Sequence, residues 1–310
     1  MKQSVERAKE PEGLRDARRA LSHIIARWTE DGEQLTTVVP RLSLFRYLER
    51  TDPHGGMYEP SVCVVAQGAK RVLLGEDSYV YDPEHYLITA VHLPTMVQII
   101  EASSRRPYLG LRLTLDLRAV AQLMVDSNLP VSREQQMDRG MATGRMTPEL
   151  LDAFRRLVAL LDQKQDVPIL APVIEREIIY RLLVGPQGGR LRQIATTGSH
   201  GHQLAGAIQW LKDHFSDPLR VEDLASRTGM SASTFHHHFR SMTALSPVQY
   251  QKKLRLQEAR RLMLVEQRDA ATAAFEVGYE SPSQFSREYK RLFGAPPVRD
   301  VEVLRHQAAG

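Results

Sequence analysis

Gln284 and Arg287 carry the most specific recognition chemistry in this 310-residue chain. In the major groove of duplex DNA, a Gln amide can form two hydrogen bonds with adenine, and an Arg guanidinium can form two with guanine. Both side chains must then leave one exposed face of a helix. Ser281 and Pro282 predict where that helix begins, because Ser caps helix N-termini and Pro fits the first helical position. The alternative for Arg287 is a surface ion pair with a neighbouring glutamate.

The pattern around these residues is written twice in the chain. Each copy has a short apolar stretch that ends at a glycine, Gly229 or Gly278, and continues with Ser-x-Ser and apolar residues at i, i+4 and i+7. A glycine that ends one helix and an apolar stripe that begins another predict two helices joined by a turn. The sequence therefore predicts two helix-turn-helix units. The expected inward residues of their second helices are Phe235, Phe239 and Met242, then Phe285, Tyr289 and Leu292.

A periodic helix from Pro247 to Val265, with Ser246 as its N-cap, is expected to separate the two units. Its length of about 18 residues corresponds to about 27 Å. With the flanking helices this approaches the ~34 Å helical repeat of B-DNA, so the two units can enter successive major grooves. Six Lys and Arg against the single Glu258 lie between His236 and Arg261, and we expect phosphates to lie along this part of the chain.

At these residues the chain resembles the AraC family of bacterial transcription regulators, whose DNA-binding domain is two helix-turn-helix units joined by one helix. The resemblance is carried by Ser231–Arg240, Ser246–Leu262 and Val277–Pro297 (VGYESPSQFSREYKRLFGAPP). It implies that the outward residues of the first recognition helix contact bases, while Arg240 contacts phosphate. The full set of predicted DNA contacts is Ser231, Ser233, His236, His237, Arg240, Lys252, Lys253, Ser283, Gln284, Ser286, Arg287 and Lys290.

From Thr36 to Leu117 the chain changes to short β-rich runs separated by Gly, Pro and Asp. Many short strands of this kind predict a sandwich or a small barrel. The stretch MYEPSVCVVAQGAKRVLLGEDSYVYDPEHYLITAVHLP resembles the cupin-like β-barrel of one AraC subgroup, which is thought to sense small molecules. The resemblance implies an unidentified small-molecule effector. The residues expected to line its cavity are Val62, Val64, Val72, Leu74, Tyr79 and Tyr81.

The rest of the chain has helical periodicity. The expected helices are Glu12–Glu30, Leu117–Asp126, Thr147–Gln163, Pro168–Val184 and Leu204–Phe215. An apolar stripe in the third of these, from Leu150 to Leu161, either covers its own domain's core or forms an isologous homodimer contact. Gly185–Gly201 is rich in Gly, Ser and Thr and predicts a linker. The predicted domains are a sensor and dimerisation domain over 1–185, a linker over 186–202, and a DNA-binding domain over 203–310.

Charge, histidine spacing and cysteine content limit the other functions that the sequence could support. The net charge of +4 is compatible with a nucleic-acid partner. The N-terminal histidines lack the clustered spacing of a metal site, and adjacent histidines at 236–238 would point about 100° apart on a helix, so we expect no metal or other cofactor. Cys63 is either a buried inert thiol or a reactive sensor thiol. A single cysteine, no signal-peptide pattern and no apolar run near ~20 residues favour a cytoplasmic protein without a membrane partner.

Together these features predict an α+β multidomain chain with an N-terminal cupin-like β-barrel and a C-terminal all-α double helix-turn-helix. The predicted function is sequence-specific binding of double-stranded DNA to regulate transcription under the control of an effector, without enzymatic activity. The resemblance implies a homodimer, contact with RNA polymerase and, commonly, activation. Two alternatives remain open: a metal-dependent cupin enzyme fused to a DNA-binding module, and an effector-independent DNA-binding protein.

Overall fold

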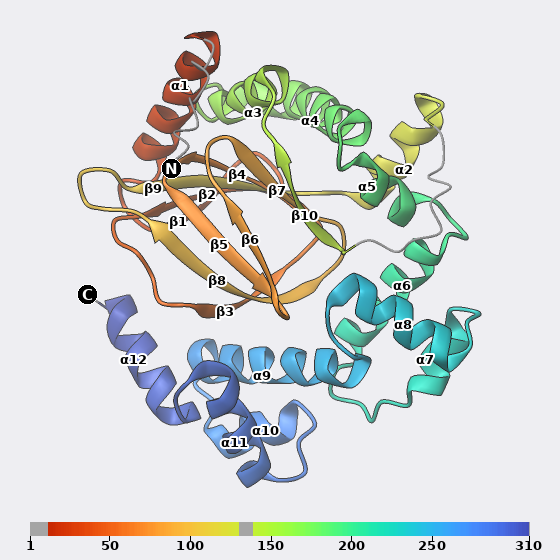
Figure 1. Ribbon diagram of the computed structural model, residues 1–310. Helices are drawn as coiled ribbons and strands as arrows, with labels where there is room; N and C mark the ends of the chain where they lie inside the picture. The colour runs from red at the N-terminus through yellow and green to blue at the C-terminus, as the bar shows by residue number, and fades with distance from the viewer. Residues whose placement is uncertain (1–11, 130–138, 310) are drawn as a thin grey trace, which may run out of the picture.

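The chain folds into two facing β-sheets, with helices on the outer face of one sheet and a helical C-terminal region beside the other (Figure 1). The computed structural model describes residues 12–129 and 139–309. Its strands are β1 (Gln34–Thr36), β2 (Leu42–Tyr47), β3 (His54–Tyr58), β4 (Ser61–Gln67), β5 (Ala69–Leu74), β6 (Asp77–Tyr81), β7 (His85–Thr89), β8 (Leu93–Glu101), β9 (Tyr108–Thr114) and β10 (Met141–Arg145). Its α-helices are α1 (Glu12–Trp28), α2 (Leu117–Asp126), α3 (Pro148–Ala159), α4 (Val167–Val184), α5 (Gly188–Ala195), α6 (His200–Asp213), α7 (Val221–Arg227), α8 (Ala232–Thr243), α9 (Pro247–Val265), α10 (Ala270–Glu276), α11 (Pro282–Phe293) and α12 (Pro297–Ala309). The predicted fold class, a β-rich N-terminal region with helices before an all-helical C-terminal region, is confirmed.

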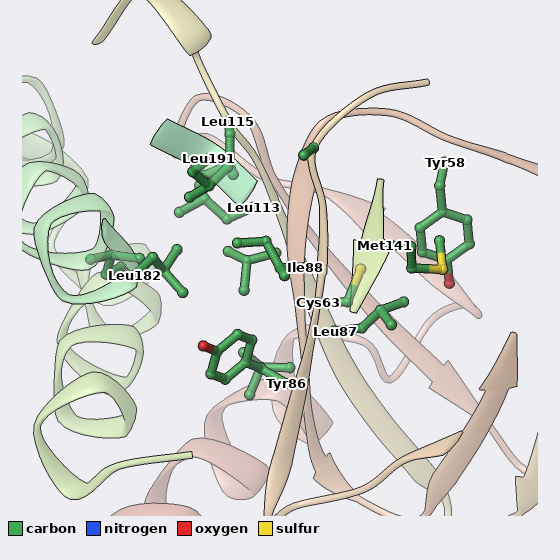
Figure 2. Close-up of a cluster of buried hydrophobic side chains, with 14 of the residues drawn as sticks. Tyr58, Cys63, Tyr86, Leu87, Ile88, Leu113, Leu115, Met141, Leu182 and Leu191 are labelled. Atoms are coloured by element: carbon green, nitrogen blue, oxygen red, sulfur yellow. The ribbon is translucent and has the colours of Figure 1, made fainter. Parts of the chain in front are cut away.

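The strands form two antiparallel sheets. The six-stranded sheet has the order β1-β2-β9-β4-β7-β10, and the four-stranded sheet has the order β3-β8-β5-β6. Tyr58 of β3 and Tyr81 of β6 are both buried, and their hydroxyl oxygens lie 3.3 Å apart. Tyr58 faces Cys63 of the six-stranded sheet (Figure 2), so side chains of both sheets enter the space between them, as expected for two sheets that pack face to face.

The six-stranded sheet is buried on both faces. Figure 2 shows Cys63, Leu87 and Met141 on the side of Tyr58, and Ile88 and Leu113 on the side of the helices. Strand β4 pairs Cys63 with Leu87 and Arg112, and pairs Val62 with Ile88 and Leu113. Because directly paired residues share a face and successive residues alternate, these two sets lie on opposite faces of the sheet.

Strand β10 lies outside the region predicted to be β-rich. Met141–Arg145 pairs with β7 and forms one edge of the six-stranded sheet. The sequence of this strand is MATGR, in which Ala142 and Gly144 have little intrinsic strand preference. The strand is fixed by its partner and by the burial of Met141, which sequence periodicity does not report.

The stripe on α3 covers the core of its own domain. Leu150, Phe154 and Leu157 are almost completely buried, and α3 packs against α1 and α4. At the end of this layer, the guanidinium of Arg27 on α1 donates to Asp162, with Nη2 2.5 Å from Oδ2. Of the two interpretations of the stripe, burial in its own core is the one that the structure supports.

The segment predicted to be a linker is packed rather than extended. Helix α5 buries Leu191 and Ile194 and contacts α2, α4 and α6. A Cβ on Gly188 would lie 1.9 Å from the carbonyl oxygen of Leu183, so only glycine permits this close approach. Helix α6 then begins at His200 with Ser199 as its N-cap, four residues before the predicted start. The Gly-rich composition therefore reflects close packing and helix ends.

The buried side chains form two separate clusters. The larger cluster includes both sheets, α1 to α6 and also Phe235 and Phe239 of α8. The smaller one is centred on Phe285 and Tyr289 of α11 and includes residues of α9, α10 and α12. The boundary between the two clusters lies along α9, not between the N-terminal and C-terminal regions.

Candidate nucleic-acid interface

Two helix-turn-helix units are present where the sequence predicts them. Helices α7 and α8 form the first unit, and α10 and α11 form the second. The side chains of Phe235, Phe239, Phe285 and Tyr289 are fully buried, with Met242 almost so and Leu292 partly buried. Because these residues recur on one face, the opposite face of each second helix is exposed. Ser231 and Ser281 cap the two helices by accepting from the backbone N–H of Thr234 and Gln284.

A glycine forms the turn of each unit, and the glycine of the second unit has less space around it. Gly229 has φ +67° and Gly278 has φ +88°, a region that side chains other than glycine rarely adopt. A Cβ at Gly229 would meet open space, whereas one at Gly278 would lie 2.2 Å from the carbonyl oxygen of Ser216. The second turn is therefore pressed against the segment that follows α6.

Arg255 of α9 holds this arrangement together. Its guanidinium donates to the carbonyl oxygens of Phe215 (2.7 Å), Ser216 (3.0 Å), Asp217 (2.9 Å) and Gly278 (2.8 Å). It thus connects the end of α6 to the turn of the second unit. The sequence suggested only a cation on the spacer, because no local pattern shows which distant carbonyl groups an arginine will reach.

The spacer α9 begins and ends at the predicted residues. Ser246 accepts from the backbone N–H of Gln249, and the Gln249 side chain accepts from the backbone N–H of Ser246. This reciprocal capping box and Pro247 at the first position define its start. Its 19 residues form one uninterrupted helix between the two units.

The predicted DNA contacts of the first unit lie on an exposed face of α8. Ser231, Ser233, His236, His237 and Arg240 are all exposed. The C-terminal end of this helix is held by the sheet region instead. Arg139 donates from Nε to Oδ2 of Asp77 at 2.6 Å and from Nη1 to the carbonyl oxygens of Arg240 and Ser241 at 2.8 and 2.6 Å.

The second unit presents Ser283, Gln284, Arg287 and Lys290 on an exposed face, with Ser286 half-buried. No hydrogen bond or ion pair from the described residues reaches the Arg287 guanidinium. The neighbouring Glu288 instead accepts from Lys252 at 2.8 Å, from the Tyr279 hydroxyl at 2.7 Å and from Gln284 at 3.3 Å. Burial opposes ionisation of Glu288, but these hydrogen bonds hold its pKa below the usual value.

The positive charge of the spacer is largely used inside the protein. Lys252 pairs with Glu288, Arg260 forms two hydrogen bonds with Asp300, and Arg261 pairs with Glu258 and Glu266. Burial lowers the pKa of Lys253. The expectation that the spacer cations are available to phosphates is therefore wrong for Arg260, whose partner Asp300 is buried and also accepts from Tyr289. For Lys252 a DNA contact would require breaking an ion pair.

Four of the six residues predicted to line an effector cavity face the space between the sheets. Val72 and Leu74 share one face of β5 with Lys70, and Tyr79 and Tyr81 lie directly opposite Val72 and Lys70 on the paired strand β6. For Val62 and Val64 the prediction is wrong, because they share the face of Ile88 and Leu113 and point toward the helices. Strand β4 is buried on both faces, so its sequence has no polar alternation that could reveal the inner face.

Comparisons with known proteins agree with this geometry. Residues 38–190 match the family described as the AraC-type transcriptional regulator N-terminus, and residues 224–300 match a helix-turn-helix domain family. The chain belongs to the AraC family. The HTH-type transcriptional activator RhaS of Escherichia coli is a relative, 28% identical over 163 residues, which are 52% of this chain and 57% of RhaS. The AraC-family chain thus aligns with little more than half the length of this curated relative.

Solved structures show the same fold for the AraC-family chain. An apo ToxT variant from Vibrio cholerae gives a TM-score of 0.53 at 11% identity, covering 84% of this chain and 97% of ToxT. ToxT bound to (E)-4-(8-methylnaphthalen-1-yl)but-3-enoic acid gives a TM-score of 0.56 at 9% identity, covering 88% of this chain and 99% of ToxT. At such low identity the likeness concerns the fold alone.

Sequence reasoning missed a cationic group between the sheets of this AraC-family chain. Lys70 lies partly buried with Nζ 5.7 Å from the ring centres of Phe45 and Tyr58. Burial lowers the pKa of Lys70 to about 8. The strand periodicity could have revealed this lysine, because Lys70 lies on the same face of β5 as Val72 and Leu74.

Cys63 faces the same interior. The thiol is buried, and burial raises its pKa despite the nearby positive charges of Lys70 and Arg112. A thiol that stays protonated is a weak nucleophile, which favours the structural interpretation of this cysteine.

The described residues offer no group of three or more His, Cys, Asp or Glu side chains placed to hold a metal ion. Of the N-terminal histidines, His85 pairs with Asp82 and His92 accepts from Lys212. Over residues 12–129 and 139–309, no helix has the length and apolar character needed to cross a membrane.

Proposed function

We propose that this protein regulates transcription by binding duplex DNA with both recognition helices, α8 and α11. The observation that carries the proposal is the pairing of two exposed polar helix faces with two buried aromatic faces on either side of one continuous helix. A helix of this length spans about 28 Å. Two recognition helices at its ends suit successive major grooves on one side of the duplex.

We assign base recognition to exposed side chains on the two recognition helices. Arg287 and Gln284 in the second unit, and His236 and His237 in the first, are exposed and of types that form hydrogen bonds with base edges. Arg240 and Lys290 are exposed cations suited to phosphates. Lys252 is a weaker phosphate ligand, because a DNA contact must first break its ion pair with Glu288. Lys253 is half-buried, and burial lowers the pKa of its ammonium, which makes it a weaker cation for phosphate.

The region between the sheets is proposed to sense a small-molecule effector. ToxT has been solved with an unsaturated fatty acid and with a naphthalenyl butenoic acid. In this chain, Lys70 among Phe45, Tyr58 and Tyr81 provides a cation in apolar surroundings, which suits an anionic effector. The RhaS relative is described as an activator, and we propose the same sign of regulation here, acting through RNA polymerase in the cytoplasm.

Helix α4 supports a homodimer. Ile169, Val173, Tyr180 and Val184 follow one another on one face of the helix and are 71%, 63%, 44% and 50% exposed. Arg176, which pairs with Asp126, lies between Val173 and Tyr180 on this face, and the exposed apolar side chains on either side of it support a contact with a second copy. In sedimentation velocity, Val173→Glu is expected to convert the dimer to a monomer, whereas Val298→Glu, also at an exposed valine, leaves the dimer intact. A wild-type monomer at all concentrations would contradict this assignment.

The experiment that tests the function is selection of binding sites from a randomised duplex library with the full-length protein. The expected result is one enriched motif with two recognised segments about one helical turn apart. No enrichment over the starting library would refute the function.

Two further measurements separate the alternatives. Bound metal in elemental analysis would favour a metal-dependent enzyme, and operator affinity unchanged across a metabolite library would favour an effector-independent protein.

A further inference from the structure

A pocket of about 560 Å³ lies where the sheet region meets the first helix of the C-terminal region. Its walls come from the loop between β7 and β8 and from α2, α5 and α6. These three helices lie along one side of the molecule (Figure 1). Val91, Leu117, Ala121, Ile194 and Ala205 make most of this lining apolar. A concave, mainly apolar space of about this volume matches the usual size of small-molecule sites. It lies on the helical side of the six-stranded sheet, apart from the space around Lys70.

His92 in the wall of this pocket touches both parts of the molecule. Its Nε2 accepts from Nζ of Lys212 on α6 at 3.0 Å, because an ammonium group can only donate. Its carbonyl oxygen accepts from the hydroxyl of Tyr250 on α9 at 2.7 Å. Since Nε2 is an acceptor, the ring proton lies on Nδ1, which has no partner among the described residues. Any molecule that occupies the pocket therefore lies beside the residue that joins the sheets to α6 and α9.

Arg118 is the only Lys or Arg side chain in the described lining of the pocket, and Asp116 accepts from its backbone N–H. Arg118 lies in the first turn of α2, where the helix dipole disfavours a positive charge. No hydrogen bond or ion pair from the described part of the chain reaches its guanidinium. No Asp or Glu is among the described lining residues. Gln122 and Gln209 are exposed, and their side-chain amide nitrogens are already bonded to Asp126 and Asp213.

We propose that this pocket binds a small molecule with an apolar body and one anionic group, and that its occupation stabilises the contact between the sheet region and α6. Arg118 holds the anionic group, and the apolar body lies between α2 and α6. The regulatory consequence rests on the proposed DNA-binding function, whereas the binding itself does not. The site is distinct from an effector site between the two sheets.

The test uses the full-length protein and 1-naphthoate as the probe, with binding measured by isothermal titration calorimetry. Gly206 faces the pocket, and a Cβ there meets nothing within 4 Å, so Gly206→Phe fills the space without strain. Gly13 on α1 is also an exposed helical glycine with open space where its Cβ would lie, and Gly13→Phe is the matched control. We expect Gly206→Phe to weaken binding about tenfold or more and Gly13→Phe to leave it unchanged.

A second variant tests the chemical class. Arg118→Gln is expected to weaken 1-naphthoate binding about tenfold and to leave the uncharged 1-naphthalenemethanol within about twofold. Equal binding of the two probes to the wild type would overturn the anionic assignment. Absence of 1-naphthoate binding to the wild type, or binding unchanged by Gly206→Phe, would overturn the site.

A third variant separates the two candidate sites. Lys70→Met changes only the interior between the two sheets. If Lys70→Met lost probe binding while Gly206→Phe bound the probe fully, the binding site would lie in that interior and not in the pocket. Hydrogen exchange gives the regulatory readout: saturating probe is expected to slow α6 amides in the wild type but not in Gly206→Phe. None of these measurements contains DNA. A protein that bound the probe but selected no DNA site would refute the proposed function and leave the pocket assignment standing.

Discussion

The two helix-turn-helix units have the same pattern but are anchored differently. Phe235 and Phe239 of the first unit belong to the buried cluster that also contains both sheets. Phe285 and Tyr289 of the second unit belong to a separate cluster with α9, α10 and α12. The boundary between the two buried cores therefore does not coincide with the domain boundary drawn along the sequence. By core packing, the sheets and the first unit form one body, and the second unit has a core of its own that joins this body along α9 and at β3.

The polar contacts follow the same division. The first unit is held by the Arg139 guanidinium and by a backbone hydrogen bond of 2.9 Å from the N–H of Gly140 to the carbonyl of Met242. The second unit meets the sheets at β3, where Gln257 donates to the Gly56 carbonyl at 3.0 Å and the Phe293 ring lies against Gly55. Both units therefore touch the sheet region, the first through residues 139 and 140 and the second at β3.

The largest expected effect comes from truncating the two equivalent aromatic residues. Phe235→Ala and Phe285→Ala each remove a fully buried ring and should cost about 3 to 5 kcal/mol. Trp28 on α1 and Trp210 on α6 both pack in the larger cluster, so their fluorescence reports that body. We expect Phe235→Ala to lower the thermal midpoint seen by fluorescence. Phe285→Ala should instead add an early helix-unfolding transition by circular dichroism with the fluorescence midpoint retained. Equal fluorescence shifts in the two variants would contradict the division.

A smaller effect is expected at the arginines near each unit. Arg139→Ala leaves Asp77 and two α8 carbonyl groups without their donor and should cost about 2 kcal/mol of stability. Arg268→Ala breaks only exposed ion pairs with Glu266 and Glu276 in the second unit and should cost less than about 1 kcal/mol. Urea denaturation measures both, and a larger cost for Arg268→Ala would reverse the comparison.

DNA binding sharpens the same comparison. Arg287→Ala in the second unit should remove one base contact, weaken operator binding by about 1 to 3 kcal/mol and relax preference at one position. Arg240→Ala in the first unit should weaken all sequences alike and reduce the slope of log K against log salt by up to about one unit. Both variants are to be measured against a randomised operator library over a salt series. A uniform loss for Arg287→Ala with its sequence preference retained would reassign that residue to phosphate or to structure.

A further small effect is expected in the pH dependence of stability at His92. Burial, and then the nearby Lys212, lower the pKa of His92 to about 4, while Glu59 and Asp213 act in the opposite direction. Between the usual histidine pKa of about 6.5 and pH 4 the unfolded state binds more protons, so stability contributed by neutral His92 is lost as the pH falls. After allowance for its partial exposure, we expect about 1 kcal/mol between pH 7 and 5. His54 and His238 also have lowered pKa values, so the measured quantity is the difference from His92→Gln, which should lose less stability. Identical pH profiles for the two proteins would remove His92 from this role.

Much of the C-terminal region could be predicted because its signals are local. Ser246, Gln249 and Pro247 specify the start of α9 through capping, and the aromatic periodicity of α8 and α11 specifies their buried faces. The exposed faces that carry the candidate DNA contacts follow directly. What those faces bind stays a prediction until DNA binding is measured.

The failures involve contacts between residues distant in sequence. Val62 and Val64 were assigned to the wrong face because β4 is apolar on both sides. The roles of Arg255 and Arg139 depend on carbonyl groups brought near by tertiary packing. The glycines at 188 and 201 suggested a linker, yet each lies against backbone atoms of another segment. Composition cannot distinguish a flexible glycine from one required for close packing.

Native-state hydrogen exchange of the full-length protein, followed across low denaturant concentrations, tests the division into two bodies most directly. Amides in one cooperative unit open with one free energy and one denaturant dependence. The amides of α8 are predicted to open together with those of β4 and β9, and those of α10 and α11 to open separately at lower free energy. If α8 and α11 instead open together while the sheets remain protected, the mechanical boundary follows the sequence and the division proposed here is wrong.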